Sequence, residues 1–228
     1  FKGAGDGSAI LRMHSKGKLV ICDTVKMKRG KFVFEGETPC VGFALVTVVP
    51  EGKESVQMRL ALENSKIEMK GDWKNVGMDE EEELVVKGMT VTGSKNNDVN
   101  EEIGKQWKVV ETLPGFTKYA ELAKKVQDNP EILEDTTFYW VYRKEFDAYM
   151  ARVKEEQLKI IVANPSVETA AYQLYFMMNE MPLEQLEQIF GLFDEKVGES
   201  ELASEVRACI ELRQRIEPGR PAPEFTLA

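Results

Sequence analysis

The spacing of apolar residues changes near residue 93, and this change narrows the possible folds more than any other feature of the chain. Before it, apolar residues alternate or form short runs that end at Gly, Pro, Asn or Ser, which is typical of strands joined by tight turns. After it, they recur every three or four residues over long stretches, which is typical of helices. We therefore expect an α+β chain, with an antiparallel β-sandwich or half-barrel in residues 1–93 and a helical domain in residues 94–217.

Strands at roughly ten-residue spacing with hairpin turns favour an antiparallel sheet. Residues 41–49 are almost all apolar, so we expect a central strand buried on both faces. Phe32 and Phe34 alternate with Val33 and Glu35, which predicts one aromatic face. Residues 63–65 should close a hairpin between the strands on either side. The expected strands are Ala9–His14, Lys18–Val25, Val41–Val49, Val56–Leu62, Lys66–Lys70 and Leu84–Val91.

The helical part begins with a capping signal at Ser94, because a serine hydroxyl before the first turn can accept a backbone N–H. Apolar side chains gather at residues 172–178, and a stripe of this kind indicates helix packing or, alternatively, a ligand pocket. We favour packing. After the first helix, the expected helices are Thr117–Gln127, Glu131–Val162, Ser166–Met178, Pro182–Phe193 and Glu199–Ile216.

Composition limits the classes of partner. Hydrophobic residues make up 43% of the chain and charged residues 30%, as in soluble globular proteins. The net charge of −9 argues against binding to nucleic acid or to an anionic membrane surface, both of which need clustered cations. No apolar run approaches the ~18 residues that cross a bilayer, so we expect no membrane insertion within this chain.

The side chains that usually carry catalysis are sparse. His14 is the single histidine and is expected on a strand surface, which argues against multi-histidine metal sites. The acidic run Asp79–Glu83 lacks the alternation of a Ca²⁺ loop and is interpreted as a solvated loop, with a metal site as the alternative. Cys22 and Cys40 are either separate thiols or a disulfide, and Cys209 fits an apolar helix face. The sequence therefore predicts no catalytic residue, cofactor or metal site in this chain.

Residues 218–228 read P-G-R-P-A-P-E-F-T-L-A, which predicts an extended segment because three prolines exclude a helix. Residues 219–227 resemble the G-K-x-A-P-D-F-T-L entry segment of thioredoxin-like domains of the TlpA/ResA and peroxiredoxin type, with Arg for Lys and Glu for Asp. In that family the nucleophilic and resolving cysteines form a W-C-x-x-C turn further along the chain. None of the three cysteines here has a partner at that spacing, so no redox residue can be carried over.

The upstream part resembles a β domain that precedes thioredoxin domains in Gram-negative envelope proteins. Residues 30–36 are similar to its G-K-F-x-F-x-G hairpin, residues 62–72 to its L-E-N-G-x-I-x-I-x-G-D, and residues 91–98 to its closing V-x-G-S-x-x-x-D. The resemblance covers most of the chain but is thin between residues 104 and 159. Because the chain begins without Met, we expect a processed or trimmed protein whose leader, including a lipoprotein leader, is absent here.

These resemblances imply the non-catalytic N-terminal region of a periplasmic or cell-envelope thiol–disulfide oxidoreductase. Its partners would be a downstream thioredoxin-like domain, onto which Pro223, Phe225 and Leu227 would dock, and possible envelope proteins. One alternative is an envelope binding module for a glycan or protein with no redox role, with an aromatic surface that uses Trp73 or Trp107. Another is a hydrolase that uses dispersed carboxylates.

Overall fold

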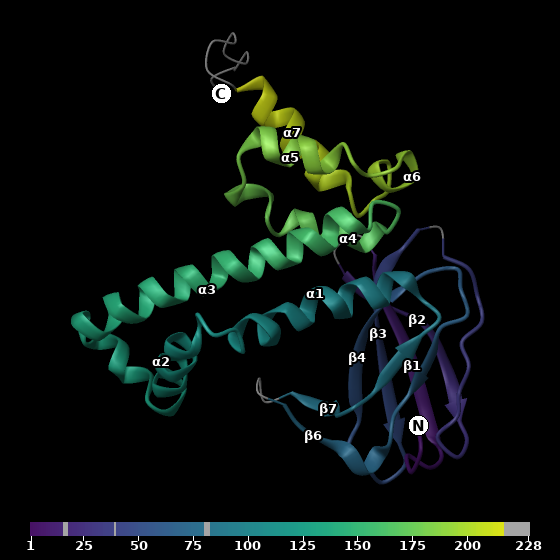
Figure 1. Ribbon diagram of the computed structural model, residues 1–228. Coiled ribbons are helices and arrows are strands. Elements are labelled where there is room, and N and C mark those ends of the chain that lie inside the picture. Colours follow the sequence, from purple (N-terminus) through teal and green to yellow (C-terminus); the bar gives the residue numbers. More distant parts are fainter. Residues whose placement is uncertain (16–17, 39, 80–82, 217–228) are drawn as a thin grey trace, which may run out of the picture. The chain divides into compact units, whose positions relative to one another are not determined.

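The computed structural model describes residues 1–15, 18–38, 40–79 and 83–216 and confirms the expected α+β class, with strands before helices (Figure 1). Two compact units make up the chain. The β unit consists of Phe1–Asp98 and Ser200–Leu202, and the helical unit of Val99–Glu199 and the described residues from Ala203 onward. Within the described part, no helix has the length and apolarity that crossing a bilayer requires.

A four-stranded antiparallel sheet forms the centre of the β unit, in the order β2-β1-β3-β4 (Figure 1). Its interior strand β3 is buried on both faces at Val46, Thr47 and Val48, as its apolar run predicts. The register pairs Leu11 with Val46 and Val46 with Met58, so apolar side chains from three strands share one face. The four strands are β1 (Gly7–Ser15), β2 (Lys18–Met27), β3 (Gly42–Pro50) and β4 (Val56–Leu62).

Two two-stranded sheets complete the β unit, and here the sequence-based prediction is wrong in two places. β5 (Glu68–Lys70) does not form a hairpin with β4 but pairs with β8 (Thr90–Thr92). The single strand expected over residues 84–91 is divided by a turn at Gly88, where φ is +72°. Its first part, β7 (Leu84–Val86), pairs with β6 (Val76–Met78), which comes after a short 3₁₀ helix at Trp73–Asn75.

At the edge of β4 where the expected β4–β5 hairpin would place a strand, a side chain bonds to the backbone of Ala61. The Asn97 side chain accepts a hydrogen bond from the Ala61 nitrogen at 2.8 Å and donates one to the Ala61 carbonyl at 2.7 Å. Asn97 is itself fixed by the predicted cap, since Ser94 Oγ accepts from its backbone nitrogen at 3.1 Å and from its side-chain amide at 2.8 Å. Asn97 therefore takes the place of a neighbouring strand.

We predict that Asn97→Ala destabilises the β unit by about 1–3 kcal/mol, because two partly buried backbone groups of Ala61 lose their partners. Chemical denaturation followed by Trp73 fluorescence measures this loss, with the other tryptophans replaced. Lys95→Ala, an exposed position on the same helix, is the control and should change stability by less than about 0.5 kcal/mol. Equal unfolding midpoints for Asn97→Ala and the parent would contradict the edge-capping role.

The helical unit contains the helices α1 to α7. Asp135 caps α3, since its side chain accepts from the Thr137 and Phe138 nitrogens, so the long helix begins at Thr136 and not at Glu131 as expected. Short 3₁₀ helices cover Pro130–Glu134 and Met178–Glu180. The α-helices are α1 (Lys95–Glu111), α2 (Thr117–Asp128), α3 (Thr136–Ala163), α4 (Glu168–Tyr175), α5 (Leu183–Phe190), α6 (Glu195–Gly198) and α7 (Ser204–Arg215).

The apolar stripe at residues 172–178 packs mainly into the core of the helical unit, as predicted. Leu174, Met177 and Met178 are buried there, whereas Phe176 is exposed. Cys209 on α7 packs against the same cluster. This stretch therefore provides packing for the helical unit.

Candidate functional site: an apolar groove in the β unit

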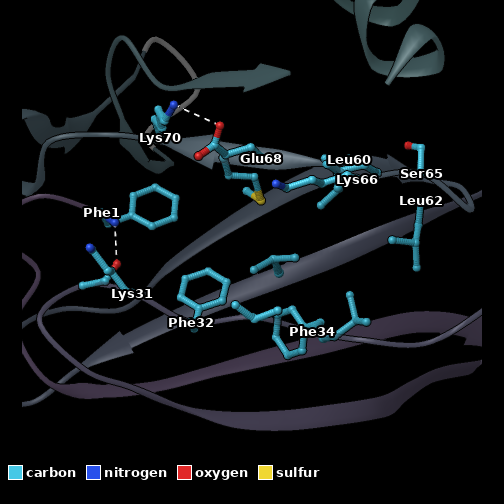
Figure 2. Close-up of a pocket in the computed structure, with 16 residues that line it drawn as sticks. Phe1, Lys31, Phe32, Phe34, Leu60, Leu62, Ser65, Lys66, Glu68 and Lys70 are labelled. Atoms are coloured by element: carbon cyan, nitrogen blue, oxygen red, sulfur yellow. Dashed lines mark hydrogen bonds and ion pairs between the residues drawn. The ribbon is translucent and has the colours of Figure 1, made fainter. Parts of the chain in front are cut away.

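An open groove of about 600 Å³ lies over the apolar face of the four-stranded sheet (Figure 2). Its floor consists of Leu11 from β1, Val46 from β3, and Leu60 and Leu62 from β4. These side chains belong to the same face because strand residues two apart point the same way. The volume falls within the range of about 300–1,000 Å³ that is common for ligand sites.

Three phenylalanines form one wall of the groove. Figure 2 shows Phe1, Phe32 and Phe34 in a row along one side. The Phe1 and Phe32 rings are stacked with centroids 6.0 Å apart, and Phe32 meets the edge of Phe34 at 5.6 Å. The aromatic face predicted from the alternation at residues 32–35 is therefore the wall of a groove.

A tight turn sets the start of this wall. Gly30 has φ of +74°, and a Cβ there would lie 1.8 Å from the Phe1 carbonyl oxygen, so no side chain fits. The Phe1 nitrogen donates to the Gly30 carbonyl, and Lys28 and Lys31 exchange backbone hydrogen bonds across the turn. This arrangement holds residue 31 and the phenylalanines after it against Phe1.

The mouth of the groove carries more positive than negative charge. Lys31, Lys66 and Lys70 line it together with Glu68, which pairs with Lys70 at 2.9 Å (Figure 2). The hydrogen bond from Lys70, with the charges of Lys70 and Lys66, lowers the pKa of Glu68, so this carboxylate stays ionised near neutrality. Three ammonium groups against one carboxylate give a local cationic rim on a chain whose net charge is −9.

The candidate site residues predicted from the sequence do not lie together in the groove. Trp73 is buried in the core of the β unit beside Phe1, so it does not offer a binding surface, whereas Trp107 on α1 is 41% exposed. Pro223, Phe225 and Leu227 lie outside the described residues, as do residues 80–82 of the acidic run and the side chain of His14. Asp79 follows β6 and Glu83 precedes β7, and the Glu83 nitrogen donates to the Asp79 side chain at 2.9 Å.

The site was only partly predictable. The alternation at Phe32 and Phe34 is visible in the sequence, but the sequence does not indicate that Lys31, Lys66 and Lys70 lie at one rim. The fold of the β unit brings these lysines to the same groove. Cys22, Cys40 and Cys209 are thiols in the structure, so the disulfide alternative for Cys22 and Cys40 is not realised.

The carboxylates of the described residues give no support to the hydrolase alternative. A general acid needs a carboxyl whose pKa is raised. Hydrogen bonds and nearby lysines or arginines instead lower the pKa of Glu68 and Glu155, and the pKa of Asp72 is lowered by Lys74 and Lys2 against the effect of desolvation. No group of three potential metal ligands is present among the residues that the structure describes.

Comparison with known proteins adds one finding. Residues 1–100 match the family model of a domain of unknown function (DUF4369). This DUF4369 segment contains all the residues of the groove. No curated protein and no solved structure matches the chain.

A second group of polar side chains lies between α2 and α3 of the helical unit. Tyr119 stacks on Tyr149 with ring centroids 4.1 Å apart and lies beside Tyr142, and the Tyr149 hydroxyl donates to the Trp107 carbonyl at 2.8 Å. Burial, with the neighbouring tyrosines and Glu111, raises the pKa of Tyr119 to about 12. Tyr119 therefore keeps its proton near neutrality, and the cluster serves packing.

We predict that this cluster makes the helical unit sensitive to alkali. The Tyr119 phenol has a pKa of about 12 in the fold and about 10 in the unfolded chain. Its contribution to the free energy of unfolding is therefore complete below about pH 10 and is lost as the pH rises towards 12. Burial and Glu111 also raise the pKa of Tyr149, so ultraviolet titration of tyrosinate should show more than one phenol that ionises late, and one fewer in Tyr119→Phe. An unchanged titration curve for that variant would contradict the assignment.

Proposed function

We propose that this chain is the non-catalytic N-terminal region of a cell-envelope thiol–disulfide oxidoreductase, which positions a downstream thioredoxin-like domain or its partner. The observation that carries the proposal is the segment at residues 219–227, which resembles the entry of a thioredoxin-like domain. The DUF4369 match supports a separate domain upstream of that segment. The chemistry would then belong to a pair of cysteines located after residue 228.

In this proposal the two parts of the enzyme have different tasks. A thioredoxin-like domain attacks a disulfide through one low-pKa thiolate and needs its partner held within reach of that sulfur. The groove of the β unit offers an apolar floor and a charged rim, which suit the holding of a partner. Pro223, Phe225 and Leu227 would dock onto the redox domain.

A second candidate function is an envelope binding module without any redox role. The groove favours it, because an apolar site with charged groups at its mouth is sufficient for recognition by itself. The two candidates differ in the sequence expected after residue 228 and agree on binding by the β unit. Binding that survives removal of everything after residue 216 is compatible with either.

The redox proposal predicts a W-C-x-x-C sequence within a few dozen residues after Ala228 in the native protein. Intact mass and peptide mapping of the protein isolated from its source test this directly. The full-length protein should then reduce insulin disulfides, and replacement of the first cysteine of that motif with Ser should abolish the activity.

The matched control is the triple replacement of Cys22, Cys40 and Cys209 with Ser, which should leave insulin reduction unchanged because these thiols take no part in exchange. A native protein without a C-x-x-C pair after residue 228 would refute the redox proposal. The binding-module candidate would then remain.

A further inference from the structure

The backbone beside the groove has an unpaired edge. Residues 32–37 come after the Gly30 turn, and Phe32 and Phe34 pack against the core of the β unit, whereas Val33, which also borders the groove, is 68% exposed. This alternation is that of an extended strand. Yet residues 32–37 form no backbone-to-backbone hydrogen bond with any other described residue and belong to no described sheet.

An extended segment without a neighbour is a template for pairing with another chain. No described residue pairs through its backbone with the N–H and C=O groups of this segment, so a second strand could add a ladder of hydrogen bonds there. The groove lies along the same segment, so the side chains of an added strand would have an apolar floor at Leu60 and Leu62 to cover.

We propose that the groove binds an extended peptide segment of a partner protein by strand addition along residues 32–37. The peptide carries apolar residues at alternate positions, which pack on the floor, and acidic residues that face Lys31, Lys66 and Lys70. The inference rests on the binding role proposed for the groove and not on the redox assignment.

Two observations favour a peptide over the other occupants. A glycan needs many hydrogen-bonding side chains, and the floor formed by Leu11, Val46, Leu60 and Leu62 offers none. An anionic amphiphile would suit the floor and the lysines but would leave the backbone edge of residues 32–37 unused. A peptide uses the floor, the rim and the edge together.

The test uses a set of capped synthetic heptapeptides and the full 228-residue chain. Three alternate positions carry Val, Leu or Phe, Thr lies between them, and both ends carry Glu or both carry Lys. Fluorescence anisotropy should detect binding by members with Glu ends, and their Lys-ended counterparts should bind several-fold more weakly. High salt should reduce this difference because the rim is exposed.

Backbone pairing is tested separately. The best peptide is remade with N-methyl groups on alternate amides, which removes ladder hydrogen bonds and keeps the side chains. We expect affinity to fall at least about tenfold. Dodecanoate, a simple anionic amphiphile, should compete weakly or not at all.

Protein variants locate the site. Lys31→Glu with Lys66→Glu should weaken the Glu-ended peptides and improve the Lys-ended ones, since both lysines are exposed and line the groove. Lys124→Glu with Lys125→Glu, at two exposed positions of α2, is the matched charge control and should change neither. Thermal unfolding of each variant verifies that the fold is kept.

Three results would overturn the inference. The first is that no member of the set binds at millimolar concentration. The second is equal affinity for the N-methylated and unmodified peptides, which would show that the backbone edge is not used. The third is dodecanoate binding that removes the peptide completely and depends on Lys31 and Lys66, which would assign the groove to an amphiphile. None of these results would bear on the C-x-x-C prediction.

Discussion

The β unit depends on how the apolar face of its four-stranded sheet is covered. β1, β3 and β4 place Leu11, Val46 and Leu60 on one face, and leaving such a face in water costs roughly 25 cal/mol per Å². No second wide sheet among the described residues covers this face. The cover consists of two small two-stranded sheets, β5–β8 and β6–β7, and of the phenylalanines after Gly30. Because this cover is incomplete, a groove remains above the floor.

The sequence predicted the features that depend on local periodicity. The four long strands lie close to their expected residues, and most of the α-helices are expected from apolar spacing and from signals such as Ser94. The exceptions are the short helix α6, which was not predicted, and the starts of α3 and α7, which come five residues late. The small strands could not be predicted in the same way. Asn97 closes the edge of β4 from 36 positions away from Ala61, and nothing in residues 61–70 reveals this contact. α3 begins later than expected because residues 130–134 form a 3₁₀ helix and Asp135 caps the α-helix after it.

The groove, too, has one feature that neighbouring residues in the sequence predict and one that depends on contacts between distant residues. Phe32 and Phe34 alternate with outward-facing residues, so an aromatic face was expected from the sequence. Lys31 is far along the chain from Lys66 and Lys70, and only the folded β unit brings the three lysines to one rim. Trp73, the more conspicuous aromatic residue, serves the core. The position of the groove therefore depends on how the sheet is covered. The redox proposal depends only on the sequence of residues 219–227.

Residues 32–37 form an extended segment whose backbone has no partner among the described residues of the β unit. Amide hydrogen exchange of the chain alone is the most direct test of this feature. The account predicts that the amides of Phe32 to Glu37 exchange nearly as fast as those of an unstructured peptide, while the amides of Val46 and Val48 in β3 are strongly protected. Strong protection of residues 32–37 without any added peptide would contradict the account, because those amides would already be paired.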